Sequence, residues 1–455
     1  MDLDELRTEF QGEVITPTTA GYDEARKIWN GMIDHRPRAI LRCTGTEDVQ
    51  SAVRFAAARD FFPSIRAGGH NVAGTALAPD GLVIDVSRMK GIAVDPAQRT
   101  ALAQTGLLWG EFDRATQAHG LATTGGLIST TGIAGLTLGG GVGWLMGRCG
   151  LTCDNTLSYD IVIADGEVIR ADQETNADLF WALKGGGGNF GVVTSITYRL
   201  HPIQTVLSGM IIHPLRAARD VLRRFRDFAE AGLPDELTVY AGAVTTPDGN
   251  PVVMIIPCYC GDDLAEGERV LAPLRKFGPP LADTVDRMPY LQLQQLLDPA
   301  APHGYRSYWK SNFLRDLPDE AIETFVSQLE CCPSPRSVTM LEHMHGAATR
   351  VASDETAFHA RKEGFDLVVL SLWDDPKDDA NNRDWTREFY SAMSPWSAGS
   401  VYGNTLSADD TDRFREAYGS NYERLSRIKA KYDPSNRFRL NTNIQPTRLA
   451  DSPAT

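Results

Sequence analysis

The stretch that decides the fold is residues 123–144, which read TTGGLISTTGIAGLTLGGGVGW. It carries eight glycines, with serine and threonine between them and few charges. A core strand would not hold so many glycines, because each costs about 0.5–1 kcal/mol in ordered structure. A disordered linker would not hold its larger apolar residues, which are Ile128, Ile133, Leu136, Leu138 and Val142. The stretch therefore predicts backbone packed against a large flat ligand, with a compact glycine loop as the alternative.

A second glycine motif lies upstream, at residues 66–74, and reads RAGGHNVAG. The preceding residues, Phe62 to Arg66, resemble a strand that ends in Gly68-Gly69. Two glycines allow the backbone to approach a bound group, and successive N–H donors suit a pyrophosphate. His70 would then project from a loop that binds a ligand. A tight turn with a surface histidine is the alternative.

A third motif contains a literal G-x-G-x-x-G at Gly186, Gly188 and Gly191. In a Rossmann fold this pattern follows a strand and opens a helix. Here a helix-like run (Asp178 to Leu183) precedes it and β-branched residues follow it. Because the order is reversed, the sequence argues against a Rossmann fold.

In the C-terminal region a helix is predicted over Asp410 to Lys431. The motif REAYGSNYERLSRIKAKYDPSNRFRLNTNIQP begins inside this helix, at Arg415. Helical spacing places Tyr418, Tyr422 and Leu425 near one face. Asp433-Pro434 should end the helix. Taken alone, Tyr418 is more readily a packed aromatic than a functional residue.

The overall composition bounds the class of protein. With 455 residues the chain should form two domains. A formal net charge of −14 disfavours nucleic acid as a partner. No stretch approaches the roughly 18 apolar residues of a membrane span. The polar start, without a signal-peptide pattern, makes a cytoplasmic location the expectation.

The seven cysteines are expected to be structural or incidental thiols rather than a disulfide framework or a zinc site. In VTMLEHMHGA, Glu342, Met344 and Gly346 share one strand face, and His343 and His345 share the other. Either face could meet a substrate. No third ligand accompanies the two histidines, so no metal is expected.

The secondary-structure pattern changes after Leu200. Before it, strands and helices alternate between glycine-rich loops, and Asp165-Gly166 predicts a hairpin. After it, strand-like runs alternate with helices expected over Ala217 to Ala231, Asp263 to Phe277 and Asp319 to Leu329. The pattern indicates an α+β protein whose second domain has a larger sheet.

Taken as a set, RAGGHN, GLTLGGGVGW, GGGGNFGVVT and KYDPSNRFRLN resemble the berberine bridge enzyme-like branch of the vanillyl-alcohol oxidase / p-cresol methylhydroxylase superfamily. Within this branch, the chain resembles most the bacterial members that are similar to 6-hydroxynicotine oxidase. The resemblance covers nearly the whole chain. It implies an FAD-binding domain in two parts, 1–205 and 403–455, and an α+β substrate domain with a large antiparallel sheet over 206–402.

The resemblance also implies roles for individual residues. His70 would bond covalently to the flavin, Val193 would lie near the adenine, and Asn441 and Asn443 would lie beside the isoalloxazine ring. Tyr418 would be the catalytic base. The remaining residues expected to bind FAD are Arg66, Ala67, Gly68, Gly69, Asn71, Ser129, Thr130, Thr131, Gly132, Gly135, Gly139, Gly140, Gly141 and Gly143.

Two positions refine the expected chemistry. Many relatives attach the flavin a second time through a cysteine, where this chain has Ile128. The resemblance therefore implies attachment through His70 only. Three residues on, Thr131 stands where oxidases of the family carry a small residue and dehydrogenases a leucine, which implies that oxygen reaches the flavin.

The function expected is an FAD oxidase that takes a hydride from a small organic substrate, an alcohol, amine or secondary-metabolite intermediate, and reduces O2 to H2O2. Two alternatives remain open, an oxidative cyclase of natural-product biosynthesis and a flavin dehydrogenase with another acceptor. A non-catalytic flavin-binding protein is disfavoured, because a covalent redox cofactor has little use in binding alone.

Overall fold

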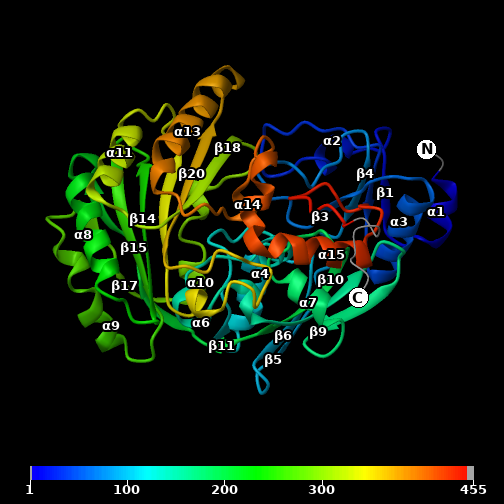
Figure 1. Cartoon of the computed structure of the whole chain (residues 1–455), viewed down its shortest axis with the longest axis horizontal. Helices are drawn as coiled ribbons and strands as arrows, with labels where there is room; N and C mark the ends of the chain where they lie inside the picture. Colours follow the sequence, from blue (N-terminus) through cyan, green and yellow to red (C-terminus); the bar gives the residue numbers. More distant parts are fainter. Residues whose placement is uncertain (1–2, 448–455) are drawn as a thin grey trace.

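The computed structural model describes residues 3–447 and places four sheets in two lobes (Figure 1). One lobe holds the N-terminal part of the chain together with its C-terminal helices. The other lobe holds a nine-stranded sheet. The α+β fold class predicted from the sequence is confirmed.

The first lobe contains three of the sheets. The mixed four-stranded sheet has the order β1 (Glu13–Ile15), β2 (Ala39–Arg42), β4 (Leu82–Asp85), β3 (Ser64–Arg66). The antiparallel five-stranded sheet has the order β5 (Ile92–Asp95), β6 (Thr100–Gln104), β10 (Val192–Arg199), β8 (Thr156–Val162), β9 (Val168–Asp172). The short third sheet pairs β7 (Leu121–Ala122) with β11 (His201–Pro202).

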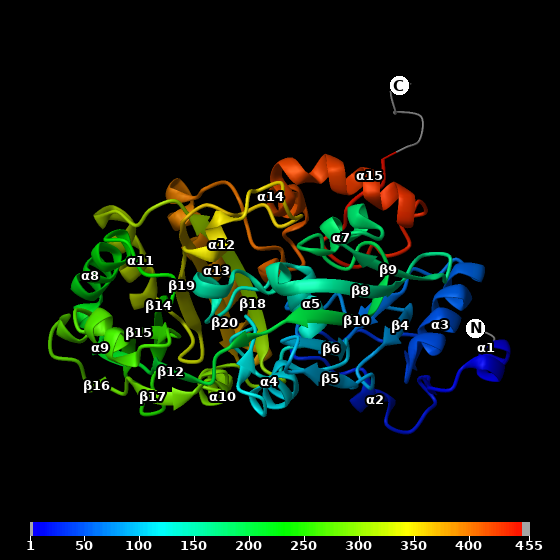
Figure 2. The same cartoon turned by 90° about the horizontal axis from the view of Figure 1, so that it is seen from below.

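Helices cover these sheets and connect them. They are α1 (Asp4–Glu9), α2 (Tyr22–Ala25), α3 (Thr46–Ala58), α4 (Trp109–Gln117), α5 (Ile133–Leu138), α6 (Met146–Cys149) and α7 (Ala177–Leu183). The C-terminal helices α14 (Phe414–Tyr418) and α15 (Tyr422–Tyr432) return to this lobe, where α15 packs on α7 (Figure 2). Chain segments from both ends of the sequence therefore build the first lobe together.

The second lobe is built on one antiparallel sheet. Its main path is β16 (Ala282–Asp283), β13 (Ile211–Pro214), β15 (Pro251–Tyr259), β14 (Leu237–Thr245), β19 (Val338–Met344), β20 (Gly364–Trp373), β18 (Arg306–Leu314). Two further strands, β12 (Thr205–Ser208) and β17 (Asp286–Pro289), pair beside β15. The predicted large antiparallel sheet is thus confirmed.

One face of this sheet is covered by helices and the other faces the first lobe (Figures 1 and 2). The covering helices are α8 (Ala218–Glu230), α9 (Leu264–Leu271), α11 (Asp319–Glu330) and α13 (Asp379–Met393). Their buried sides show the three- and four-residue spacing of amphipathic helices, as Val221, Leu222 and Phe225 do on α8. Two short helices, α10 (Tyr290–Leu293) and α12 (Ala347–Arg350), lie in loops of the second lobe.

Of two local predictions, the structure confirms one and corrects the other. The hairpin at Asp165-Gly166 is confirmed, since β8 and β9 pair on either side of it and Gly166 has a φ of 84°. The single helix predicted over 410–431 is instead interrupted at Gly419, which has a φ of 48°. A Cβ there would come within 2.2 Å of the His359 ring, so the chain turns where a loop of the second lobe packs against it.

Candidate active site

A cavity of about 1010 Å³ lies between the glycine-rich loops of the first lobe and the uncovered face of the large sheet. The loops at 67–71, 126–139 and 185–189 and the segment 438–442 form one side. Strands β13, β14, β15, β19 and β20 form the other side. The volume lies at the upper end of ligand pockets, which suits a large cofactor with a small substrate beside it.

His70 lies in the cavity wall, and its ring is held on three sides. Nε2 lies 3.2 Å from the Thr130 hydroxyl. The ring stacks on Trp29 with centroids 4.8 Å apart and meets His303 edge-on at 5.8 Å. Burial, with His303 beside it, lowers the pKa of His70 to about 3. The imidazole is therefore neutral at physiological pH, the form that can act as a nucleophile or ligand.

The two glycine loops meet backbone to backbone behind His70. A Cβ at Gly68 would lie 2.5 Å from the Gly132 nitrogen, and a Cβ at Gly132 would lie 2.6 Å from the Gly68 nitrogen. Only glycine allows this approach, and Gly69 also has a φ of 66°. Within the described chain, no acceptor is recorded for the backbone N–H groups of residues 68–71. These N–H groups are available to an anion such as a pyrophosphate.

Other glycines open directly on the cavity. At Gly135 and Gly188 an added Cβ would meet no atom within 4 Å. The residues at these positions therefore present bare backbone to whatever occupies the space. This is the arrangement expected of a loop against a flat ring system.

The C-terminal segment closes the same end of the cavity. The Asn441 amide donates from Nδ2 to the Gly188 carbonyl at 3.2 Å, while its Oδ1 has no partner within the described residues. The Oδ1 of Asn443 is likewise buried without a partner there. Buried amide oxygens normally accept a hydrogen bond. Of the two, Asn441 lines the cavity, and its orphaned acceptor fits a ligand that presents an N–H donor.

Tyr418 lines the cavity, but its hydroxyl is already engaged. It donates to the Thr442 carbonyl at 2.8 Å, and Asn189 Nδ2 lies 3.4 Å away. Burial raises the pKa of the Tyr418 phenol, with a weaker lowering by the Asn189 hydrogen bond. A neutral phenol that donates to a backbone carbonyl is poorly prepared to accept a proton.

The cavity brings together twelve of the residues expected to bind cofactor or substrate, and seven lie outside its wall. The twelve are Ala67, Gly68, Gly69, His70, Asn71, Thr131, Gly132, Gly135, Gly139, Val193, Tyr418 and Asn441. The seven are Arg66, Ser129, Thr130, Gly140, Gly141, Gly143 and Asn443. Several of the seven support the wall from behind. Ser129, for example, donates through its backbone and its hydroxyl to the two oxygens of Asp298.

No cysteine lines the cavity among the described residues, and Ile128 does. All seven cysteines are free thiols. Burial raises the pKa of Cys149 and of Cys153 to about 12, so neither is a ready nucleophile. Within residues 3–447 no group of three or more potential metal ligands occurs.

The wall opposite the glycine loops carries a feature that the sequence indicated only in part. The Glu342 face of β19, rather than the His343 face, meets the cavity. Asp366 of β20 lies directly across the ladder from Glu342. Burial raises the pKa of both carboxyls, and Asp366 raises that of Glu342 further. No local sequence pattern pointed to Asp366, because its neighbour across the sheet is known only from the strand register.

Comparison with known proteins agrees with this site. The FAD binding domain family matches residues 37–172, and the berberine and berberine-like family matches residues 401–445. An FAD-linked oxidoreductase of Dictyostelium discoideum is 30% identical over 448 residues, which cover 98% of this chain and 97% of the relative. The (R)-6-hydroxynicotine oxidase of Paenarthrobacter nicotinovorans is 29% identical and covers 96% of this chain and 97% of its own.

Solved structures show the same fold. The crystal structure of 6-hydroxy-D-nicotine oxidase from Arthrobacter nicotinovorans superposes with a TM-score of 0.87 at 29% identity, over 96% of this chain and 98% of that one. The BBE-like 1 protein of Physcomitrella patens superposes with a TM-score of 0.86 at 22% identity, over 98% and 100% of the two chains. The loops, the orphaned amides and these matches fit FAD. The chain belongs to the berberine bridge enzyme-like family of FAD-linked oxidoreductases, within the vanillyl-alcohol oxidase / p-cresol methylhydroxylase superfamily.

Proposed function

We propose that this oxidoreductase holds FAD covalently through His70 alone, oxidises a small organic molecule by hydride removal, and passes the electrons to O2. The observation that carries the proposal is the setting of His70. A neutral imidazole stands in the cavity wall, with one nitrogen at the Thr130 hydroxyl and its ring fixed on Trp29. The second nitrogen is left for the cofactor.

A single attachment is supported by the cysteine geometry. The thiols nearest in sequence to Ile128, Cys149 and Cys153, do not line the cavity, whereas Ile128 does. Bound FAD would supply the redox chemistry. The chain supplies the backbone cradle at 68–71, the amides of Asn441 and Asn443, and a substrate surface on the large sheet.

The domain division that fits this function runs from 1 to 205, from 206 to 402 and from 403 to 455. All strands of the nine-stranded sheet lie within 205–373, and α15 packs against α7 of the first lobe. Residues 1–2 and 448–455 of these segments lie outside the described chain.

Oxygen as the acceptor is supported by Thr131, which lines the cavity with a side chain smaller than leucine. A role for Tyr418 as base remains part of the proposal through the family resemblance. Its hydrogen bond to Thr442 is the structural argument for a positioning role instead.

The experiment is anaerobic screening of alcohols, amines and phenols for bleaching of the flavin absorption, followed by admission of air. The proposal predicts that at least one class bleaches the flavin, and that air restores the colour with formation of H2O2. Colour that returns only with an artificial electron acceptor would contradict O2 as the acceptor. A protein that takes up no FAD would contradict the proposal as a whole.

A further inference from the structure

Where the uncovered face of the large sheet lines the cavity, it is mainly apolar and carries one carboxyl group among the described residues. Alternate residues of two central strands point into the cavity, namely Val338, Met340 and Glu342 on β19 and Val368, Leu370 and Leu372 on β20. Ile212 of β13, Met254 of β15 and Met210, which precedes β13, add to this wall. Glu342 is therefore an ionisable group in a mainly apolar part of the wall. A bound substrate would have to be complementary to the apolar surface and to the carboxyl group.

Glu342 has no partner in the described chain. It is 7% exposed, and none of its oxygens accepts a hydrogen bond or forms an ion pair with a group in residues 3–447. Buried carboxyls are nearly always paired. An unpaired carboxyl that faces a ligand cavity is therefore complementary to a polar or positively charged group on the ligand.

Asp366 adds a second carboxyl group without a partner next to Glu342. It is fully buried beside Glu342, and both of its oxygens lack partners within the described residues. Two carboxyls at adjacent positions of a dry sheet repel each other once ionised. The pair therefore favours either retained protons or a cation nearby.

The other titratable groups that face the pair supply no positive charge. They are the hydroxyls of Tyr240 on β14, which stands opposite Glu342 in the sheet, and of Tyr402. Burial raises the pKa of both phenols, so both are neutral. The Tyr402 hydroxyl already accepts from the Gly141 N–H at 3.0 Å and from Asn404 at 2.8 Å.

We propose that Glu342, backed by Asp366, is the site for the amino group of an apolar amine substrate. Glu342 contacts the ammonium group and takes its proton, which leaves a neutral amine. Bound FAD would accept the hydride that leaves the C–H bond next to nitrogen, while the nitrogen lone pair forms C=N. The substrate thus loses one proton to Glu342 and one hydride, and O2 would finally accept the two electrons of that hydride.

This inference rests on the proposed oxidase function and narrows its substrate to apolar amines. The probe pair is 2-phenylpropan-2-amine and 2-phenylpropan-2-ol, which have nearly the same shape and no hydrogen on the carbon that bears the functional group. Neither can be oxidised, so binding is measured alone. The readouts are perturbation of the flavin spectrum and, independently of flavin, the shift in melting temperature at pH 7.

The expected result is that the wild-type protein binds the amine at least about tenfold more tightly than the alcohol, a difference of about 1.4 kcal/mol. Glu342→Gln should remove this preference and leave alcohol binding unchanged. Asp366→Asn should keep the preference, because Asp366 lies beside Glu342 on the same face of the sheet but only Glu342 of the two lines the cavity. Glu363→Gln, at an acid whose side chain is 63% exposed, is the matched control and should behave as wild type.

Equal binding of amine and alcohol by the wild type would overturn the inference. So would loss of the preference in Asp366→Asn but not in Glu342→Gln, or an equal loss of both ligands in Glu342→Gln. A yellow protein that alcohols bleach and amines do not would overturn it while leaving the oxidase intact. A protein that takes up no FAD would fail the proposed function, and the thermal-shift comparison would still test the amine site.

Discussion

At the residue scale, Asp366 in the large sheet is expected to lower the stability of the protein while it supports the substrate site at Glu342. Asp366 is a buried carboxyl whose oxygens lack partners in the described chain, and burial raises its pKa. A raised pKa means that the folded protein keeps a proton that the unfolded chain releases near pH 4. Stability therefore falls as the pH rises from that value through the raised pKa of the folded state.

Asp366→Asn should therefore stabilise the protein, and more at pH 9 than at pH 6. One unit of pKa shift corresponds to about 1.4 kcal/mol, which is about 1.5 °C in melting temperature for a chain of 455 residues, so a gain of a few degrees is expected at pH 9. Thermal unfolding at the two pH values measures it, with Glu363→Gln as the control. A melting temperature that is unchanged or lower at pH 9 would show that Asp366 has a stabilising partner.

Thr131 is the residue at which access of oxygen should be most sensitive. Thr131→Leu adds bulk to the cavity wall where the family resemblance places the oxygen-reacting face. Reoxidation of the reduced flavin by air should slow by about tenfold or more, equivalent to about 1.4 kcal/mol in barrier. Stopped-flow mixing of reduced protein with O2 measures it, and reduction by substrate should change less. Equal reoxidation rates would place oxygen entry elsewhere.

Some site residues could be predicted because a local sequence pattern marks them, and others could not because their role depends on contacts that are distant in sequence. His70 and the loop glycines could be found because bare backbone against a ligand leaves a dense local glycine pattern. Asn441 and Asn443 came from the family resemblance. Asp366 had no local signal, since its importance arises from register with Glu342 across the sheet. For Tyr418, helical spacing did not reveal that its hydroxyl donates to Thr442.

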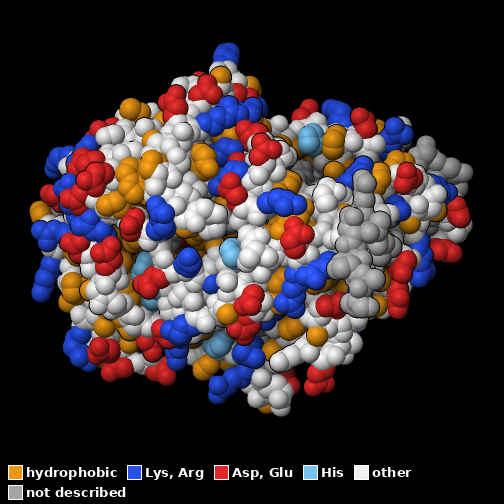
Figure 3. Space-filling model, in the orientation of Figure 1, with side chains coloured by type: hydrophobic (Ala, Val, Ile, Leu, Met, Phe, Trp, Pro, Cys, Tyr) orange, Lys and Arg blue, Asp and Glu red, His pale blue; other side chains and the backbone are white. Residues whose placement is uncertain are grey.

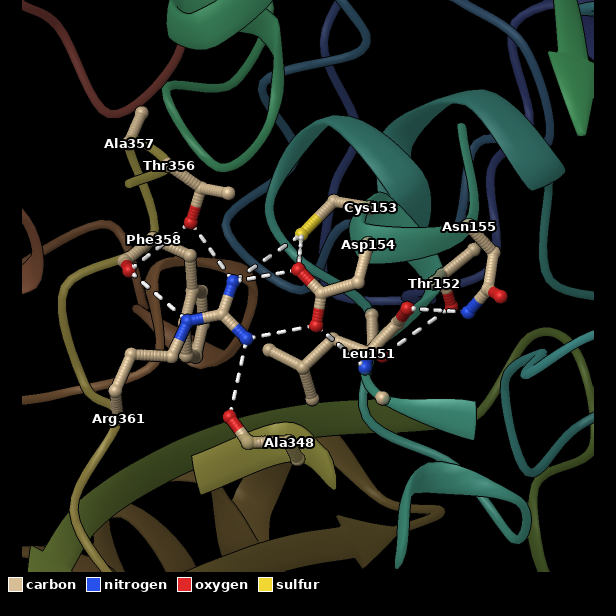
Figure 4. Close-up of polar contacts among 12 residues, drawn as sticks. Leu151, Thr152, Cys153, Asp154, Asn155, Ala348, Thr356, Ala357, Phe358 and Arg361 are labelled. Carbon is tan, nitrogen blue, oxygen red and sulfur yellow. Dashed lines mark hydrogen bonds and ion pairs between the residues drawn. The ribbon is translucent and has the colours of Figure 1, made fainter. Parts of the chain in front are cut away.

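Among the elements, the loop between β19 and β20 connects the two lobes. Its Arg361 forms a two-pronged ion pair with Asp154, at 2.7 Å for each oxygen, and also donates to Thr356 and to the Ala348 carbonyl (Figure 4). The guanidinium group is almost fully buried. The loop also places Phe358 against Gly140 and Gly185, which adjoin the cavity.

Arg361→Met should destabilise the protein by about 3–5 kcal/mol, because it leaves the Asp154 carboxylate buried and uncompensated. The double variant Arg361→Met/Asp154→Asn should recover part of the loss, since no charge is then stranded. Denaturant unfolding of the holoprotein measures both, and Arg336→Met, at an exposed ion pair with Asp374, is the control. A double variant no more stable than the single one would contradict the importance of the pair.

The elements themselves were predicted unevenly. The amphipathic helices α8 and α11 and the β8–β9 hairpin were predictable, because periodicity and turn chemistry are local. The break at Gly419 was not, because it depends on contact with His359 from another lobe. The pairing order of the nine-stranded sheet is likewise a long-range property that no window of sequence contains.

For the whole molecule, both ends of the chain and the central sheet surround one cavity. Acidic and basic side chains are interspersed on the face in Figure 3. Within residues 3–447, no helix is long and apolar enough to cross a membrane. Because residues of both lobes line the cavity, a ligand in it should contribute to holding the lobes together.

Removal of the covalent link offers a test of this contribution. His70→Ala should yield protein whose FAD can be dialysed away, and whose melting temperature then rises with added FAD. At 100 times the dissociation constant the stabilisation is about 2.7 kcal/mol. Differential scanning fluorimetry across an FAD series measures it, with added riboflavin, which lacks the pyrophosphate, as the matched ligand. A melting temperature indifferent to FAD would mean that the cavity is not the FAD site.

The most direct measurement is acid precipitation of the purified wild-type protein, followed by proteolysis and mass spectrometry of the coloured peptide. We predict that the yellow colour stays in the pellet, and that the flavin mass lies on a peptide containing His70 and on none containing Cys149 or Cys153. Colour that moves entirely into the supernatant, or flavin mapped to another residue, would contradict the attachment on which this account of the site depends.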